Sequence, residues 1–515
     1  MKKMLGFFSC LLAIMGIFIL ASCGGSGIVA HMTVEARRTE LEVTVEFDEN
    51  ELLESSSTKL AVKLYDKDET YKNQSSLSFS DGVYTISTCK FSNLAKDTEY
   101  ILKLYVSIDG EEELLLTQNT ATAATGETED DPIEIGTKSE FLNIKADGSA
   151  CYKLMADIDL GGEIITLFTS SRKFTGVFDG NGHTIKNYSS SGTYAGLFGY
   201  CSEATIKNLT VEEFTYKSSS SKPKLGALVG YAEYSTIENC KADNISIELT
   251  PSSTISEQRV SVGAIIGEVI TSTVKNCQVY NANISIPRGR NKSAVGLFIG
   301  TIDGMSDVQN CHAQGLAKIV MNTTTDGAYL YLGGFAGYSS TTMPIKSCYV
   351  SGTLDLSAVS NVDYKLSLGG FIGSTYNGIT NIENCFAVTD IIVKAAKKDA
   401  ADGEPESYYK IATSSNIGGF IGTCGSSVIA INNCYTFKLE KGIEILSDAE
   451  NLNVALLIAE KSKVDASLLT TLYAYDNTVT VEGVTPDLAG YDSTKVESTL
   501  SAELVQVLKE LKVID

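Results

Sequence analysis

The sequence predicts an all-β protein in which a small β-sandwich precedes a right-handed parallel β-helix. The main observation is a six-residue pattern, bounded by glycine, that recurs every 31 to 37 residues with one interval of 49. Its copies end at Gly199, Gly230, Gly267, Gly300, Gly337, Gly373 and Gly422. Asn-Cys or a close variant follows each copy after 9 to 11 residues. A fixed period of this length is typical of solenoids.

The amino-acid composition also favours strands and turns. Among 515 residues there are 44 Gly, 7 Pro and no Trp, and Thr, Val, Ile, Tyr and Ser are plentiful. β-Branched and aromatic residues favour strands, whereas glycine favours turns. Crossovers between parallel strands are almost always right-handed, and this predicts the hand of the helix.

Residues 1–22 have the features of an export signal. Lys2 and Lys3 precede an apolar run over residues 4–20, as the n-region and h-region of a signal peptide do. The run ends in L-A-S-C at Cys23, which resembles the lipobox of bacterial lipoproteins. That resemblance implies that the Cys23 thiol is acylated and that residues 1–22 are removed. An ordinary secretory signal and an uncleaved helix are the alternatives.

The residues after the lipobox indicate where the protein is anchored. Gly24 follows Cys23, so the Asp that retains many bacterial lipoproteins at the inner membrane is absent. An outer-membrane or cell-surface location is therefore expected. No later run approaches the roughly 20 apolar residues of a membrane span, so the lipid is expected to be the anchor. Residues 23–32 are expected to form a tether.

The charge balance argues against nucleic-acid binding. The chain has 41 basic and 63 acidic residues, and loss of residues 1–22 removes two lysines, which leaves a net charge of −24. Such a chain has no basic stripe with which to neutralise phosphates. The charge is expected to serve solubility.

Ten cysteines remain besides Cys10 and Cys23, and six of these occupy one repeat position. In-register neighbours on parallel strands lie ~4.8 Å apart, which is wider than the ~3.8 Å Cβ separation of a disulfide. We therefore expect a column of buried free thiols. A metal site is the alternative, but the sequence holds no Cys-x-x-Cys or Cys/His cluster. The six are Cys240, Cys277, Cys311, Cys348, Cys385 and Cys434.

Residues 33–122 are predicted to form the β-sandwich. Apolar and polar residues alternate over 41–47 and 60–64, as in half-buried strands. The segment 91–100 resembles the E–F corner of fibronectin type III domains, in which the Tyr hydroxyl, here that of Tyr100, bonds to the corner backbone. The acidic residues 123–131 are predicted to be a linker.

Residues 132–500 are predicted to form the β-helix. Thr137 and Glu140 have the spacing of a capping box, which predicts a short helix over the first coil. We expect three strands per coil, the first being the glycine-bounded motif itself, such as L-G-G-F-I-G at 368–373. The column of asparagines before the cysteines is expected to form a structural ladder. Residues 454–475 are expected to be a degraded coil, and residues 501–515 a capping helix.

A family resemblance rests on three features of this region. They are the strand D-I-D-L at 157–160, the segment F-T-G-V-F-D-G-N-G-H-T-I at 174–185, and the glycine repeats. Together they resemble GLUG-motif proteins, which occur on bacterial surfaces, often in Bacteroides-like species, and are commonly regarded as adhesins. GLUG repeats also occur in very large surface proteases, but the protease motif His-Glu-x-x-His is absent from this sequence. The resemblance implies fold and location, and little about activity.

Catalytic, cofactor-binding and metal-binding residues are not predicted. The only histidines, His31, His183 and His312, form no pattern with a nucleophile. Glycoside cleavage needs two carboxylates across a cleft, and the best such pair is Asp157 and Asp159. That pair also belongs to the strand of the family motif. In a polysaccharide lyase, the arginines at 288 and 290 would be the candidates for the catalytic base. Their segment is equally typical of an exposed turn.

Two features favour binding instead. Insertions recur after the last strand of a coil, at 250–260, 287–293, 322–330, 357–366 and 394–415, and per-repeat insertions often mark a binding face. The residue after the ladder cysteine is aromatic in the last three copies: Tyr349, Phe386 and Tyr435. These three would form a strip for stacking on sugars if they point outward, and local packing is the alternative.

The sequence therefore predicts a lipid-anchored surface protein that acts as an adhesin or as a scaffold for a glycan or a host-matrix protein. A passive structural protein of the envelope is the first alternative. A polysaccharide lyase or hydrolase is the second.

Overall fold

A computed structural model of the chain divides into two units, Met1–Ile133 and Glu134–Asp515. The structure describes residues 28–36, 39–47, 58–77, 86–95, 98–122, 126, 128–165, 167–218, 223–249, 260–286, 293–321, 329–358, 365–376, 380–396, 415–425, 429–446, 453–455, 458–460, 472–475 and 479–481. The predicted signal peptide, Cys23 and the C-terminal helix over 501–515 lie outside these residues.

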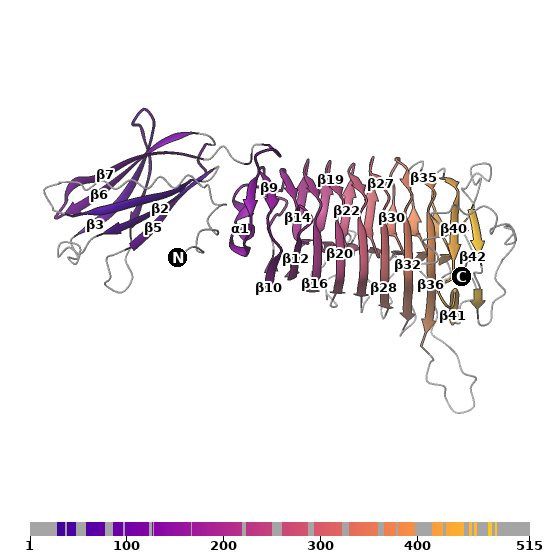
Figure 1. Ribbon diagram of the computed structural model, residues 1–515. Helices are drawn as coiled ribbons and strands as arrows, with labels where there is room; N and C mark the ends of the chain where they lie inside the picture. The colour runs from indigo at the N-terminus through magenta and orange to yellow at the C-terminus, as the bar shows by residue number, and fades with distance from the viewer. Residues whose placement is uncertain are drawn as a thin grey trace, which may run out of the picture. The chain divides into compact units, whose positions relative to one another are not determined.

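The first unit is a sandwich of two antiparallel sheets, β1-β2-β5 and β4-β3-β6-β7 (Figure 1). Apolar side chains at alternate positions fill the space between them, and Val43, Leu64 and Leu104 are fully buried. The strands are β1 (Ala30–Ala36), β2 (Glu40–Phe47), β3 (Lys59–Asp66), β4 (Tyr71–Leu77), β5 (Ile86–Ser92), β6 (Glu99–Ile108) and β7 (Glu111–Ala121).

The sandwich begins earlier than the sequence suggested. His31 lies within β1 and not in a tether, and Ile28 is already buried in the core. Apolar residues at Ala30, Met32 and Val34 alternate inward, and this extends the strand toward the N-terminus.

The predicted tyrosine corner is confirmed. The backbone N–H of Ala95 donates to the hydroxyl of Tyr100 over 3.0 Å, and Tyr100 is buried. The bond satisfies a backbone donor in the connection between β5 and β6, and so fixes the path between the two sheets.

Near the start of the second unit, β8 (Ile133–Ile135) is followed by α1 (Lys138–Asn143) and the 3-10 turn η2 (Ile144–Ala146). The predicted capping box is present, because Thr137 Oγ1 accepts from Glu140 N and the Glu140 carboxylate accepts from Thr137 N. Phe141 is buried and packs edge-on against Phe178, with ring centroids 6.0 Å apart. The helix therefore covers the first coil, as expected.

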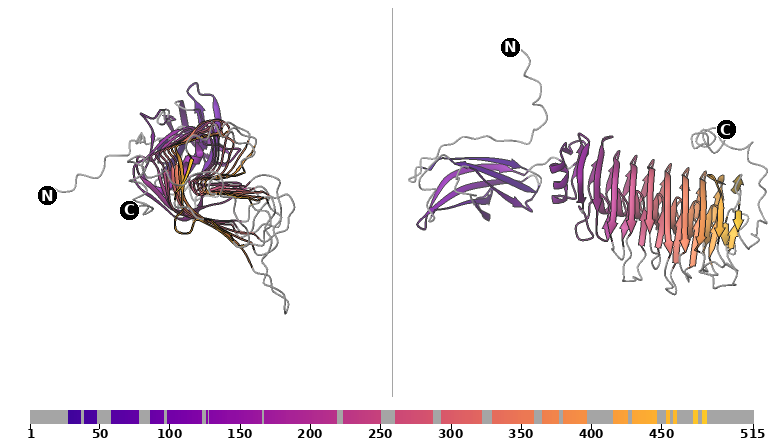
Figure 2. Two further views of the ribbon diagram at one scale, coloured as in Figure 1. Left: turned by 90° about the vertical axis from the view of Figure 1, so that its right-hand side faces the viewer. Right: turned by 90° about the horizontal axis from the view of Figure 1, so that it is seen from below.

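The rest of the second unit is a parallel β-helix with four sheets, numbered here in the order in which each coil visits them. Strands of successive coils overlie one another when the stack is viewed end-on (Figure 2). Sheet 1 contains β13 (Tyr194–Ala195), β17 (Lys224–Leu225), β21 (Val260–Gly263), β25 (Ser293–Gly296), β29 (Tyr329–Gly333), β33 (Lys365–Gly369), β37 (Asn416–Gly418) and β42 (Asn453–Ala455). Sheet 2 contains β14 (Phe198–Ser202), β18 (Val229–Glu233), β22 (Ile266–Ile270), β26 (Ile299–Asp303), β30 (Ala336–Ser339), β34 (Ile372–Thr375), β38 (Ile421–Cys424) and β43 (Ile458–Glu460).

Sheets 3 and 4 complete each coil. Sheet 3 contains β8 (Ile133–Ile135), β9 (Cys151–Leu154), β11 (Val177–Asp179), β15 (Thr205–Lys207), β19 (Thr236–Glu238), β23 (Thr273–Lys275), β27 (Asp307–Gln309), β31 (Ile345–Lys346), β35 (Thr380–Glu383) and β39 (Ile429–Asn432). Sheet 4 contains β10 (Ile158–Ile165), β12 (Thr184–Ser190), β16 (Thr210–Ser218), β20 (Lys241–Leu249), β24 (Gln278–Ile286), β28 (His312–Met321), β32 (Tyr349–Ala358), β36 (Phe386–Ala395), β40 (Cys434–Phe437), β41 (Ile443–Leu446), β44 (Leu472–Tyr475) and β45 (Val479–Val481). The expected degraded coil is present as β42, β43 and β44.

The prediction of three strands per coil was wrong, because the glycine motif is a corner between two strands. In L-G-G-F-I-G at 368–373, β33 ends at Gly369 and β34 begins at Ile372. A Cβ on Gly369 would lie 1.9 Å from the carbonyl oxygen of Ile372. Sheets 1 and 2 thus approach each other backbone to backbone, which only glycine permits.

The connection between β40 and β41 is held by a buried carboxylate. Asp390 in β36 is 3% exposed. Its Oδ1 accepts hydrogen bonds from the backbone N–H groups of four successive residues, 439 to 442, at 2.8–3.1 Å. These residues separate β40 from β41, so Asp390 fixes the interruption in sheet 4.

Asp390→Ala is expected to destabilise the coil that contains β40 and β41 by about 3 kcal/mol, because four backbone donors lose a charged acceptor. Hydrogen exchange of the β41 amides would measure the change locally, as suits a solenoid that opens coil by coil. Asp390→Asn keeps an acceptor oxygen and should lose less. Equal protection of β41 in Asp390→Ala and the parent protein would contradict this role.

Candidate functional site

The aromatic residues predicted as a binding strip do come together in register. In sheet 4, His312 pairs with Tyr349, Tyr349 with Phe386, and Phe386 with Tyr435. The rings of His312 and Tyr349 stack at 4.6 Å and 7°, and those of Tyr349 and Phe386 at 4.7 Å and 3°. We call these four residues the post-cysteine ladder.

The rings of this ladder face one another and not solvent. Phe386 is 6% exposed and Tyr435 is 2% exposed, while Tyr349 is half-buried. Stacking on a sugar needs a free ring face, and in the stacked pairs the neighbouring ring occupies that face. The geometry therefore corresponds to local packing, which was the alternative to a sugar-binding strip for these residues.

His312, the first residue of the post-cysteine ladder in the sequence, is hydrogen-bonded to a tyrosine of the preceding coil. Its Nε2 lies 2.8 Å from the Tyr280 hydroxyl, and burial lowers the pKa of His312 to about 4. The imidazole is therefore neutral near pH 7. The ammonium of Lys241 lies 5.2 Å from the centre of the Tyr280 ring and 2.8 Å from Asp243 Oδ2. Because its imidazole is hydrogen-bonded to Tyr280 and stacked on Tyr349, His312 is part of the packing and is not placed as a general base.

The Asp-x-Asp pair at Asp157 and Asp159 is occupied by contacts to the next coil. Asp157 Oδ1 accepts from Thr184 N at 2.9 Å and lies 3.1 Å from His183 Nδ1. Asp159 Oδ1 accepts from Asn187 Nδ2 at 3.0 Å and from the backbone of its own turn. Backbone hydrogen bonds lower the pKa of both carboxyl groups. Both carboxylates thus tie β10 to β12, while the arginines at 288 and 290 lie outside the described residues.

The predicted asparagine ladder is confirmed. Its members all have φ between 51° and 54°, the left-handed region that Asn tolerates. Asn239 Nδ2 donates to Asn208 Oδ1 at 3.1 Å and Asn276 Nδ2 to Asn239 Oδ1 at 3.0 Å, and the pattern continues at Asn310 and Asn433. The members are Asn208, Asn239, Asn276, Asn310, Ser347, Asn384 and Asn433.

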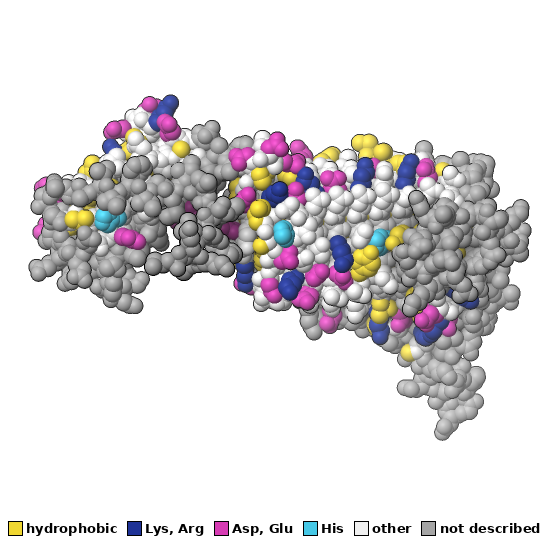
Figure 3. All heavy atoms as spheres, in the orientation of Figure 1, with side chains coloured by type: hydrophobic (Ala, Val, Ile, Leu, Met, Phe, Trp, Pro, Cys, Tyr) yellow, Lys and Arg dark blue, Asp and Glu magenta, His cyan; other side chains and the backbone are white. Residues whose placement is uncertain are grey.

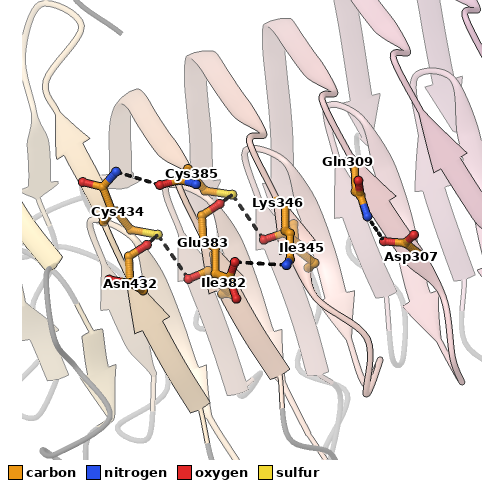
Figure 4. A network of polar contacts seen from close by, with 11 residues as sticks. Asp307, Gln309, Ile345, Lys346, Ile382, Glu383, Cys385, Asn432 and Cys434 are labelled. Atoms are coloured by element: carbon orange, nitrogen blue, oxygen red, sulfur yellow. Dashed lines mark hydrogen bonds and ion pairs between the residues drawn. The ribbon is translucent and has the colours of Figure 1, made fainter. Parts of the chain in front are cut away.

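The cysteine column beside it is buried and its thiols are free. Each Sγ lies near backbone carbonyl oxygens, as for Cys434 with Ile382 O at 3.5 Å (Figure 4). Burial raises the pKa of the Cys240 and Cys434 thiols well above the ordinary value. These are the properties of small buried apolar side chains and not of reactive thiolates.

The native protein is therefore expected to react slowly with a thiol reagent such as 5,5′-dithiobis(2-nitrobenzoate). In denaturant, the ten described cysteines should all react. The release of thionitrobenzoate before and after unfolding measures both quantities. Fast reaction of the native protein, or a shortfall after unfolding without reductant, would contradict the free and buried column.

An outward column of sheet 3 carries alternating charge from Lys207 to Lys275. Lys207 pairs in register with Glu238, and Glu238 with Lys275. The next position of the column is Gln309, which pairs in register with Lys275 and with Lys346, so the alternation is interrupted there. Lys275 Nζ lies 3.2 Å from Asp307 Oδ2 on the same strand as Gln309, and Lys346 Nζ lies 3.1 Å from Glu383 Oε2 (Figure 4). Figure 3 shows the resulting mixture of acidic and basic side chains on this face. The residues of this face that the structure describes form no single-sign patch for a charged partner.

A second candidate binding surface, which was not predicted from the sequence, lies where sheets 1 and 2 meet. Two columns of side chains point away from the core and touch across the glycine corner. We call them the sheet 1–2 strip. Sheet 1 contributes Tyr194, Lys224, Ser261, Ala294, Tyr331, Ser367 and Asn416. Sheet 2 contributes Tyr200, Tyr231, Glu268, Thr301, Tyr338, Ser374 and Thr423.

The first part of the strip is a cluster of three tyrosines. Ring centroids lie 4.9 Å apart for Tyr194 and Tyr200, 5.7 Å for Tyr194 and Tyr231, and 4.7 Å for Tyr200 and Tyr231, with planes 46–68° apart. Lys173 Nζ lies 4.9 Å from the centre of the Tyr200 ring and 2.7 Å from Glu233 Oε1. Tyr194 and Tyr231 are half-buried, so neither residue is fully enclosed.

The middle of the strip is a buried polar network. Lys224 pairs with Glu268, whose Oε2 accepts from Ser261 Oγ at 2.7 Å. The hydroxyls of Ser261 and Thr301 lie 2.8 Å apart. Ser261 and Thr301 are fully buried, so this part joins the two sheets and offers little surface.

A second tyrosine cluster follows. The rings of Tyr331 and Tyr338 lie 5.3 Å apart at 42°, and those of Tyr329 and Tyr331 lie 6.1 Å apart. Lys365 Nζ lies 5.5 Å from the centre of the Tyr329 ring. Tyr329 and Tyr331 are half-buried. The two clusters thus share a composition of three tyrosines and a lysine.

Sheet 1 is also where the predicted insertions return to the stack. The connections run from β20 to β21, β24 to β25, β28 to β29, β32 to β33 and β36 to β37. Their first and last residues lie at equivalent places, because the strands on either side are in register. The insertions themselves lie largely outside the described residues.

Two further findings concern what the described residues lack. They contain no group of three or more His, Cys, Asp or Glu side chains placed to hold a metal ion. Within them, none of the helices has the length and apolar character needed to cross a membrane.

Comparisons with known proteins identify one motif. Residues 225–248, which run from β17 to β20, match the GLUG motif. A search of curated proteins finds no match. Among solved structures, an IgA1 protease is 14% identical with a TM-score of 0.37, over 82% of this chain and 29% of that one. Pectate lyase PelI from Erwinia chrysanthemi, in complex with tetragalacturonic acid, is 12% identical with a TM-score of 0.13. That match covers 75% of this chain and 97% of the lyase chain.

Proposed function

We propose that the protein is a lipid-anchored adhesin of the bacterial cell surface, whose β-helix binds a glycan or a matrix protein. One observation carries the proposal: five connections enter sheet 1 at equivalent positions, beside a strip with half-buried tyrosines. Loops on a rigid stack are a common way to present binding residues. The GLUG motif fits a surface or extracellular protein.

The anchor and the spacer belong to the same proposal. The lipobox ending at Cys23 supports acylation and placement at the outer membrane. The sheets β1-β2-β5 and β4-β3-β6-β7, together with the corner at Tyr100, support a fibronectin type III-like spacer between anchor and β-helix. Bacteroides-like bacteria are the proposed source.

The anchor is tested by Cys23→Ala in the full-length protein expressed in a Gram-negative host. Metabolic labelling with palmitate should mark the parent protein and leave the variant unlabelled, and the variant should leave the membrane fraction. Labelling of both proteins, or of neither, would remove the lipid from the proposal.

Binding is tested on arrays of glycans and matrix proteins with the protein lacking its signal peptide. A variant in which residues 397–414 are replaced by a short Gly-Ser linker should lose part of the signal, because this is the longest connection into sheet 1. No binding by the parent protein to any array would favour the passive structural alternative. Release of unsaturated or reducing ends from a polysaccharide panel would favour the cleavage alternative.

A further inference from the structure

The tyrosine clusters differ from the post-cysteine ladder in how their rings are presented. The ladder rings lie within 7° of parallel, so each covers its neighbour's face. In the first cluster the planes are 46–68° apart, which leaves ring faces only partly covered. Because Tyr194 and Tyr231 are half-buried, this is an aromatic surface open to a ligand.

We propose that the two tyrosine clusters of the sheet 1–2 strip bind one neutral polysaccharide chain that runs along the stack of coils. The inference rests on the proposed binding function and names its site and ligand class. The C–H faces of sugar rings would lie on Tyr194 and Tyr231 in the first cluster and on Tyr331 in the second.

The spacing of the clusters suits a polymer. Tyr231 pairs with Glu268, Glu268 with Thr301, and Thr301 with Tyr338, so Tyr231 and Tyr338 are three coil-to-coil steps apart. At ~4.8 Å per coil this separation is about 14 Å along the stack. One extended chain of several sugars spans that distance and would contact the two clusters while passing the buried middle of the strip, whereas a monosaccharide reaches only one cluster.

Polar groups beside the rings can bind sugar hydroxyls. The Glu233 carboxylate accepts from Lys173 Nζ at 2.7 Å and from Ser202 Oγ at 3.0 Å. It is therefore held in place beside Tyr231. Lys173 keeps part of its side chain exposed and has further protons to donate. An aromatic face flanked by fixed donors and acceptors is the chemistry that a sugar ring needs.

Charge distinguishes a neutral glycan from an acidic one. Lys173 is paired with Glu233, and Lys224 with Glu268, so the first cluster and the middle of the strip present little uncompensated positive charge. The second cluster adds one exposed lysine, Lys365. The chain as a whole carries a formal charge of −22. Uronate-rich or sulfated polymers would therefore be repelled at low ionic strength.

The side chains also favour a glycan over a protein partner. Among the outward residues that define the strip, Ala294 is the only aliphatic one, and the others are tyrosine, hydroxyl, amide or charged residues. Protein interfaces also use tyrosine anchors, but their cores are depleted of charged residues, whereas Lys173, Glu233, Lys224 and Glu268 lie within or beside this strip. A protein that binds in place of a glycan is an outcome the test must detect.

The test compares Tyr231→Ala, Tyr331→Ala and the double variant in the protein without its signal peptide. Affinity electrophoresis in gels that contain neutral or acidic polysaccharides selects the polymer, and calorimetry measures Kd. Each single change should weaken polymer binding about tenfold, as loss of an aromatic anchor does. The double change should weaken it more than either single one. A disaccharide should bind weakly and respond to one of the two changes only.

Two controls make the result specific. Tyr234→Ala removes a tyrosine that is 62% exposed in the same coil but outside the strip, and should leave Kd unchanged. Tyr231→Phe keeps the ring and should retain most of the affinity, while circular dichroism reports whether each variant is folded.

Several outcomes would overturn the inference. Folded Tyr231→Ala and Tyr331→Ala proteins that bind the polymer as the parent does would place the site elsewhere, and the proposed function would stand if replacement of residues 397–414 still reduced binding. The ligand class would be wrong if the parent protein preferred an acidic polymer. It would also be wrong if the parent protein bound a protein partner and both variants lost that binding. No binding to anything would overturn the proposed function itself.

Discussion

Gly337→Ala is expected to lower the free energy of unfolding by about 3 kcal/mol or more, because the added methyl group meets backbone and not a movable side chain. A Cβ at this position would lie 2.2 Å from Val295 N and 2.7 Å from the carbonyl carbon of Ala294. Both atoms belong to sheet 1 of the preceding coil. Relief therefore requires that sheets 1 and 2 move apart over neighbouring coils.

Urea denaturation followed by circular dichroism would measure the loss. Gly136→Ala is the matched control, because its added Cβ would have no neighbour closer than 3.9 Å, and it should change stability by less than about 0.5 kcal/mol. If the two variants were equally stable, close backbone approach would not be the reason for glycine at the corner.

Phe335→Ala is expected to cost about 3–5 kcal/mol, the range for loss of a buried aromatic side chain. Phe335 is fully buried and stacks between Phe298 at 4.8 Å and Phe371 at 4.9 Å. Both neighbours are themselves fixed in the column, so the space cannot close by a simple change of rotamer. Phe420 continues the same stack beyond Phe371.

The loss should appear first in the central coils. Hydrogen exchange should show faster exchange of amides in β29, β30 and β34 than in the sandwich, which is a separate unit. Tyr234→Ala, an exposed change in the same unit, is expected to shift stability by less than about 0.5 kcal/mol. A Phe335→Ala protein as stable as this control would show that the column does not support the core.

The spacing of the repeats predicted which residues are neighbours, because a solenoid places equivalent positions beside one another. The asparagine ladder, the cysteine column and the order of Tyr349, Phe386 and Tyr435 all follow from that rule. The capping box at Thr137 and the corner at Tyr100 are local and were also predictable.

The path within one coil was harder to predict. A run such as L-G-G-F-I-G is apolar throughout, so periodicity does not distinguish one buried strand from two short strands joined at a corner. Close approach between sheets 1 and 2 decides the matter, and besides the corner itself it involves residues of neighbouring coils, such as Val295 beside Gly337. The direction of Phe386 and Tyr435 was unpredictable for the same reason.

The sheet 1–2 strip was missed because its residues alternate with core residues on either side of that corner. A signal was nevertheless present. The residue directly after the last glycine of the motif is Tyr200, Tyr231 or Tyr338 in three of the copies. Once the corner is known, this position must point away from the core, because the residue that follows it, such as Ala232, is buried.

The alternating charges on sheet 3 restrict how such a protein can change its length. Deletion of the coil that carries Glu238 would bring Lys207 beside Lys275, at the ~4.8 Å spacing of adjacent strands, and like charges directly opposite one another destabilise a sheet. Deletion of two neighbouring coils preserves the sequence of signs. Gain and loss of repeats during evolution should therefore be tolerated best in even numbers across this part of the stack.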